Sequence, residues 1–235
     1  MRVPRHLQVL LGSLLLVALA ACTGGSDEPT AEEPSPAEVM AAAQERFEET
    51  SGVRLALATD DLPDGVPGVL AADGVGTSAP AFDGELTVSL SGQSVTVPVV
   101  AVDGKVYAQL PFTGSFSKVD PAAYGAPDPA GLLDPATGFP ALLTSTEGLE
   151  EGESVRGGAD NSEILTEYTG TIPAAAVRQV IPSATGAPFD VAWQVSDTDE
   201  LRQAALTGTF YPDSEPMTYT VDFSDYGTEP EITRP

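Results

Sequence analysis

The side chains that most often carry out covalent catalysis are almost absent from this sequence of 235 residues. Its one histidine is His6 and its one cysteine is Cys22, both near the start of the chain. The residues after position 22 therefore lack the groups for Ser–His catalysis, Cys–His catalysis and histidine-ligated zinc. We expect no enzymatic activity, no metal centre and no cofactor.

Carboxylates are abundant, and some are neighbours in sequence: Asp60-Asp61, Glu150-Glu151 and Asp197-Thr198-Asp199. A glycosidase needs two carboxyl groups that converge across a cleft, which neighbours in sequence do not indicate. A calcium site at 197–199 is a weaker alternative, because this stretch lacks the glycine and the terminal glutamate of an EF-hand loop. A solvated acidic surface explains these residues more simply.

The charge of the chain limits its partners. The sequence has 35 acidic and 10 basic residues, a formal net charge of −25. Loss of Arg2 and Arg5 with a cleaved leader leaves 35 acids and 8 bases, a net charge of −27. Such a charge repels the phosphates of nucleic acids and excludes a polybasic patch for anionic lipids.

The N-terminus has the pattern of a bacterial lipoprotein signal. Arg2 and Arg5 precede an apolar run at 7–19, and Leu19-Ala20-Ala21-Cys22 resembles a lipobox. Residues 1–21 are then a signal peptide, and Cys22 carries a diacylglyceryl group with fatty acids such as palmitate. Residues 22–35 are the acylated cysteine and a flexible tether, and 36–235 form a single domain. We expect a monomer held on the extracytoplasmic face of the cell membrane by its acyl chains.

The stretch from Gly84 to Leu110 predicts three strands joined by tight turns at Ser91-Gly92 and Asp103-Gly104. These turns place Leu86 opposite Val97, Val88 opposite Val95, Val99 opposite Ala108 and Val97 opposite Leu110. Because side chains alternate between faces, one face is aliphatic. It carries Leu86, Val88, Leu90, Val95, Val97, Val99, Ala101, Val106, Ala108 and Leu110.

The rest of the chain predicts more strands and a few helices. Ser35 begins a capping box for a helix over 36–50, Pro173 precedes a helix that ends at Pro182, and 139–147 is a short helix. Residues 111–138 predict a loop with one or two helical turns at 129–134. With eight to ten strands and no βαβ alternation, the fold class is α+β with a long antiparallel sheet.

The aliphatic face has two interpretations. It either packs against the helices as a solid core, or leaves room for alkyl chains between sheet and helices. The absence of aromatic side chains on the face, and the short, Ala-rich helices opposite it, favour a cavity. In the helix after Pro173, the residues expected to face inward are Ala176, Val177 and Val180, and the two valines are expected to line the cavity.

Several segments resemble the actinobacterial LppX/LprAFG lipoprotein family, especially its LprG-like members. They are the lipobox, the helix after the tether, LTVSLSG with VVAVDGKVYAQL, DPAGLLDPATGFPALL, AAAVRQVIP and the end of the chain through Tyr226-Gly227. The resemblance implies a strongly curved antiparallel sheet, a half barrel similar to the LolA/LolB carriers, with helices packed on the concave face. It also implies a cavity for the acyl chains of diacylated or triacylated lipids or glycolipids.

The function implied by this family is movement of lipids across the cell envelope beside a major-facilitator exporter. The cavity residues are then Leu86, Val88, Leu90, Val95, Val97, Val99, Val106, Ala108, Leu110, Val177 and Val180. Basic residues are few and scattered, which favours a neutral head group. The alternative is a non-catalytic cell-surface scaffold that binds a partner protein and holds no ligand.

Overall fold

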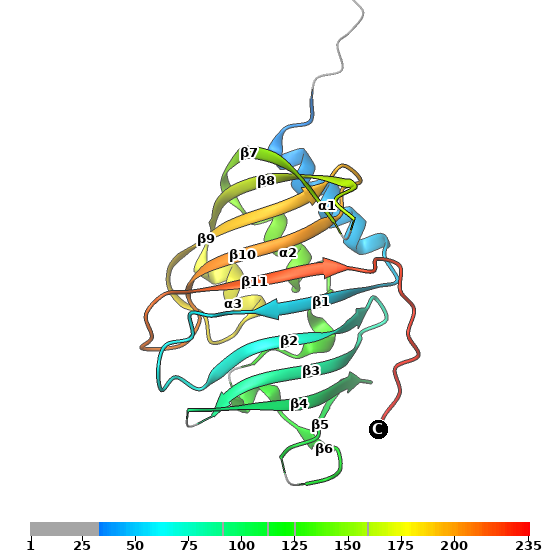
Figure 1. Ribbon diagram of the computed structural model, residues 1–235, viewed down its shortest axis with the longest axis vertical. Helices are drawn as coiled ribbons and strands as arrows, with labels where there is room; N and C mark the ends of the chain where they lie inside the picture. Colours follow the sequence, from blue (N-terminus) through cyan, green and yellow to red (C-terminus); the bar gives the residue numbers. More distant parts are fainter. Residues whose placement is uncertain (1–32, 91, 112, 125, 159) are drawn as a thin grey trace, which may run out of the picture. The chain divides into compact units, whose positions relative to one another are not determined.

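The structure, a computed structural model, describes residues 33–90, 92–111, 113–124, 126–158 and 160–235. Eleven antiparallel strands form one open, curved sheet in the order β6-β5-β4-β3-β2-β1-β11-β10-β9-β8-β7 (Figure 1). The strands are β1 (Gly52–Ala58), β2 (Gly68–Thr77), β3 (Ala81–Leu90), β4 (Gln93–Val102), β5 (Lys105–Ala108), β6 (Ser117–Val119), β7 (Glu147–Gly157), β8 (Glu163–Ile172), β9 (Thr185–Ser196), β10 (Leu201–Thr209) and β11 (Met217–Ser224). The predicted class and antiparallel sheet are confirmed.

The central meander has the predicted register. Leu86 pairs with Val97, Val88 with Val95, and Val99 with Ala108. Asp103 and Gly104 have φ angles of 54° and 65°, as a type I′ turn requires. Ser91 lies outside the described residues, and β5 ends at Ala108, so the pairing expected for Leu110 is not part of the ladder.

Helix α1 (Pro36–Glu49) begins as predicted. The Glu38 amide donates to Ser35 Oγ over 3.4 Å, and the Ser35 amide donates to the Glu38 carboxylate over 2.8 Å. This capping box satisfies two backbone donors that the first turn leaves unpaired. Met40, Ala43 and Phe47 lie on one stripe and are buried. The capping box therefore predicts the start of the helix, and the amphipathic pattern predicts the face that is buried.

The segment between β5 and β7 differs most from expectation. It contains the strand β6 and two 3₁₀ turns, η1 (Pro121–Tyr124) and η2 (Pro129–Gly131), of which the sequence predicts only η2. Strand β6 has three residues, too few to show an alternating pattern. Helix α2 (Phe139–Thr144) ends three residues earlier than predicted, because Glu147 already begins β7.

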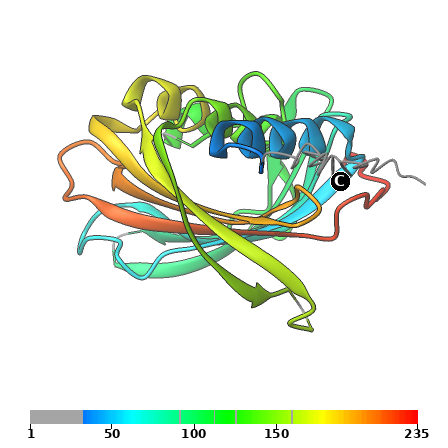
Figure 2. The same cartoon turned by 90° about the horizontal axis from the view of Figure 1, so that it is seen from above.

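Helices α1, α2 and α3 (Ala174–Val180) all lie on one side of the sheet (Figure 2). We call the sheet face toward them the inner face. Buried residues of the helices and the inner face form one hydrophobic cluster. Close aromatic pairs concentrate on the part formed by β9, β10, β11 and the helices; Phe189 and Phe210, for example, have ring centroids 4.9 Å apart.

Two glycine positions let aromatic rings pack closely against the inner face. A Cβ at Gly74 would lie 2.4 Å from Phe82 Cζ, and a Cβ at Gly208 would lie 2.2 Å from Phe189 Cδ1. Atoms that are not bonded to each other cannot approach this closely. The rings of Phe82 and Phe189 therefore occupy the space that a Cβ atom at position 74 or 208 would need. The need for glycine here comes from packing, since neither residue has a positive φ.

Gly208→Ala is expected to destabilise the domain by about 1–3 kcal/mol, because Phe189 has to leave a fully buried position. Gly131→Ala is the control, since a Cβ there meets nothing within 4 Å. Urea unfolding followed by circular dichroism measures both. Equal effects of the two substitutions would contradict the packing explanation.

Candidate functional site

Part of the inner face forms an aliphatic surface across four neighbouring strands. Strand pairing places Leu57 opposite Ala72, Ala72 opposite Leu86, and Leu86 opposite Val97. The next pair toward the 91–92 turn is Val88 with Val95. We call these six residues, Leu57, Ala72, Leu86, Val88, Val95 and Val97, the aliphatic floor.

The exposure of the inner-face side chains increases along these strands, from the 78–80 turn toward the 91–92 turn. Leu55 and Val99, one step from the floor toward the 78–80 turn, are 3% and 4% exposed. Within the floor only Val97 is buried and the other residues are half-buried, and Leu90 beyond it is 47% exposed. The inner face is therefore closed at one end and open at the end that carries the 91–92 turn, which we call the mouth end.

The closed end is filled by side chains from two parts of the chain. The ring of Phe82 lies over Gly74 and Gly84, and Leu133, just after η2, lies against Gly76. Phe82 is the only aromatic residue of β2, β3 and β4, strands that the structure describes in full. The floor next to it is thus lined by flexible aliphatic groups, whereas the β9–β11 part of the inner face is packed with rings.

A pair of tyrosines fixes β2 at the mouth end. The Tyr219 hydroxyl donates to the Val69 carbonyl over 2.6 Å, and the Val69 amide donates to the Tyr211 hydroxyl over 2.8 Å. The hydroxyl oxygens are 2.8 Å apart, so Tyr211 donates to Tyr219. Burial, with Tyr211 as neighbour, raises the pKa of Tyr219 far above its usual range. Both hydroxyls are fully engaged, so they position β2 at its register shift between Val69 and Ala71.

The predicted cavity residues separate into three groups. Val97, Val99, Val106 and Ala108 are buried in the cluster, Leu86, Val88, Val95 and Leu110 are half-buried against it, and Leu90 is exposed. Val177 and Val180 are buried in the same cluster, but α3 packs on β9 and α2, on the part of the sheet distant from β3–β5 in strand order. The structure thus brings the strand residues together and leaves the α3 residues apart from them.

Sequence reasoning missed Leu57, Ala72 and the tyrosine pair. Leu57 continues the alternation of Val53 and Leu55, which could have placed it on the inner face. Ala72 follows only from the register of β2, which has an irregularity between Val69 and Ala71. No local pattern indicates that Tyr211 and Tyr219 would bind the backbone of Val69, which lies 142 and 150 residues earlier in the chain.

Two cavities of about 390 and 510 Å³ lie elsewhere and contain no residue of the floor. The first is on the opposite face of the sheet, and the second lies between the C-terminal segment and the turns at 78–80 and 103–104. Among the described residues, no group of three or more His, Cys, Asp or Glu side chains could hold a metal ion. Cys22 lies outside the described residues, and within them no helix is long and apolar enough to cross a membrane.

Comparison with known proteins agrees with this architecture. The sequence profile of the LppX/LprAFG lipoprotein family matches residues 35–232. The chain belongs to this family. Its fold is shared by LprF from Mycobacterium bovis, with 16% identity, a TM-score of 0.68, and coverage of 86% of this chain and 98% of LprF. The lipoprotein LppX from Mycobacterium tuberculosis has 16% identity, a TM-score of 0.62, and coverage of 86% and 100%.

A LolA superfamily protein from Nitrosomonas europaea also aligns, with 11% identity, a TM-score of 0.30, and coverage of 86% of this chain and 99% of its own. A search of curated proteins gave no match. The predicted family and the predicted large, curved antiparallel sheet are confirmed. The chain is therefore a member of a lipoprotein family with the fold of LprF and LppX.

Proposed function

We propose that this protein is a membrane-anchored, non-catalytic carrier that binds acyl chains of lipids or glycolipids and moves them across the cell envelope. Acyl chains on Cys22 hold it on the extracytoplasmic face of the membrane. Its cargo has two or three chains, and a major-facilitator exporter works beside it. Membership of a lipoprotein family supports this proposal.

The observation that carries the proposal is the open end of the aliphatic floor. Five of its six residues remain half-exposed although they lie on the same face as a closely packed core. Water in contact with such a surface is unfavourable by roughly 25 cal/mol per Å² of apolar area. An alkyl chain laid across Leu57, Ala72, Leu86 and Val97 removes that contact, and each buried methylene contributes about 0.8 kcal/mol.

Long acyl chains require movement at the closed end. Leu133 and Ala130 are buried and lie in the segment around η2, which packs on β2, β3 and β4. A chain that extends from the floor past Gly76 displaces Leu133. We therefore propose that residues 111–140 act as a movable flap. Hydrogen exchange with and without bound lipid tests this, and equal protection of the flap in both states would contradict it.

The carrier function is tested by the lipid that the protein retains. A soluble form of residues 35–235, purified from an actinobacterial host and extracted with organic solvent, is expected to release about one acyl lipid per protein in mass spectrometry. A tagged protein of similar size with a fully packed core, passed through the same lysate and columns, controls for unspecific lipid. An extract without lipid would favour the alternative, a scaffold whose sheet and helices enclose a solid core.

A further inference from the structure

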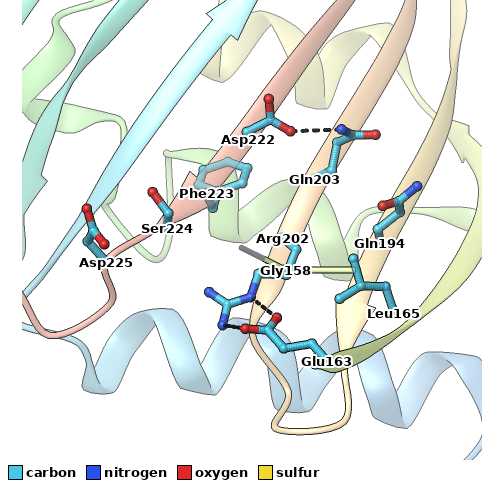
Figure 3. Close-up of a pocket in the computed structure, with 10 residues that line it drawn as sticks. All are labelled: Gly158, Glu163, Leu165, Gln194, Arg202, Gln203, Asp222, Phe223, Ser224 and Asp225. Carbon is cyan, nitrogen blue, oxygen red and sulfur yellow. Dashed lines mark hydrogen bonds and ion pairs between the residues drawn. The ribbon is translucent and has the colours of Figure 1, made fainter. Parts of the chain in front are cut away.

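The cavity of about 390 Å³ lies on the outer face of the sheet, across β8, β9, β10 and β11 (Figure 3). Its main polar residues are Gln194, Gln203 and Asp222. They alternate along their strands with Trp193, Ala204 and Val221, which are buried beneath the helices. Sheet and core therefore separate this cavity from the aliphatic floor, and the proposed lipid site does not explain it.

The cavity presents planar polar groups with unused hydrogen-bonding capacity. Gln203 Nε2 donates to Asp222 Oδ1 over 2.8 Å, which fixes both side chains and leaves Gln203 Oε1 and Asp222 Oδ2 as acceptors (Figure 3). The amide of Gln194 makes no hydrogen bond with any residue that the structure describes. The Ser224 hydroxyl, which can both donate and accept, lies on the same side. These groups suit a ligand with several hydroxyls.

The charges of the cavity exclude an anionic ligand. Among the described residues that line it, the one cation is Arg202. Its guanidinium pairs with Glu163 through Nε and Nη2 at 2.6 and 2.7 Å and with Glu200 at 2.8 Å. This guanidinium is therefore neutralised by two carboxylates and has little attraction left for a phosphate. Asp222 and Asp225 add negative charge, so a phosphorylated ligand is repelled.

We propose that this outer cavity binds a neutral sugar residue. Sugar hydroxyls donate to Asp222 and the Gln203 carbonyl and accept from the amide of Gln194. The volume of about 390 Å³ lies in the range of about 300–1,000 Å³ typical of small-molecule sites. The sugar belongs either to a free glycan of the envelope or to the head group of a glycolipid.

The proposal is tested with the full-length protein in detergent, titrated with the neutral trisaccharides maltotriose, mannotriose and cellotriose by calorimetry. Saturable binding of at least one is expected. Gln203→Ala and Gln194→Ala each remove hydrogen bonds to the sugar and are expected to weaken it about threefold to tenfold. Glu85→Gln is the matched control, because Glu85 lies on the outer face of β3, away from the cavity, and is expected to leave affinity unchanged.

Two further measurements separate the sources of the sugar and the competing ligands. A glycolipid with the same sugar is titrated in micelles into the Leu86→Trp protein, in which the floor is blocked. Binding of this glycolipid is still expected to depend on Gln203. Sugar binding that is lost in Leu86→Trp but unaffected by Gln203→Ala would overturn the proposal. So would saturable binding of spermidine or glucose 6-phosphate without binding of any neutral trisaccharide. Circular dichroism verifies that each variant is folded.

Discussion

Leu86→Trp is expected to reduce the acyl lipid that copurifies with the protein at least tenfold. Leu86 lies in the middle of the floor, between Ala72 and Val97, and is half-buried. Ala72 is the smallest side chain of the floor, so an indole at position 86 lies across it and fills the space that an alkyl chain would occupy. Because the site is open toward the mouth end, the added volume blocks binding without requiring a rearrangement of the buried core.

The matched control is Thr96→Trp. Thr96 is exposed on the outer face of β4, next in sequence to Val97, the partner of Leu86. The control therefore introduces the same ring into the same hairpin on the opposite face. Mass spectrometry of organic extracts, normalised to protein, compares the two variants with the wild type. An equal lipid content in Leu86→Trp and the wild type would show that acyl chains do not lie on the floor.

The floor could be predicted in large part because two turns determine its register. Gly104 favours the positive φ of the type I′ turn, and the pairing that follows puts Val99 opposite Ala108. Once the register is fixed, the side-chain period of two assigns every residue of β3, β4 and β5 to a face. The α3 residues could not be placed in this way. Val177 and Val180 have the spacing of a buried helical stripe, but that spacing does not indicate which strands the helix covers.

The open and closed ends of the inner face could not be predicted either, because they depend on contacts between distant segments. Leu133 reaches Gly76, and Tyr211 reaches Val69, across long stretches of chain. The same holds for the outer cavity, where Asp222 joins Gln203 only through the pairing of β10 with β11. Local patterns determine strands and faces. The sites arise where the sheet brings those strands together.

Trp193→Ala is expected to destabilise the domain by about 3–5 kcal/mol. Trp193 is fully buried on the inner face of β9, opposite Tyr168 and Ala204. Its Nε1 donates to Thr146 Oγ1 over 3.1 Å, and Thr146 in turn donates to the Leu142 carbonyl at the end of α2 over 3.0 Å. The substitution therefore leaves a cavity and releases the contact between α2 and the sheet.

Two further variants separate packing from hydrogen bonding. Thr146→Val removes the acceptor and leaves the indole N–H unpaired, which costs about 1–3 kcal/mol. Gln194 follows Trp193 in β9, and its side chain lies on the outer face. Gln194→Ala is therefore expected to alter the free energy of unfolding by no more than about 0.5 kcal/mol. Urea unfolding at 25 °C, followed by far-ultraviolet circular dichroism, measures all three.

The result at Trp193 also bears on the division of the inner face into two parts. A folded domain is stable by only about 5–15 kcal/mol, so a loss of 3–5 kcal/mol identifies the β9–β11 part as the source of much of that stability. Leu86→Ala, in the half-exposed floor, is expected to cost less than 2 kcal/mol, because little buried surface is lost. Similar losses at Trp193 and Leu86 would mean that the floor is an ordinary core. A large difference would mean that the β9–β11 part of the sheet provides most of the stability, while the floor remains free to bind an acyl chain.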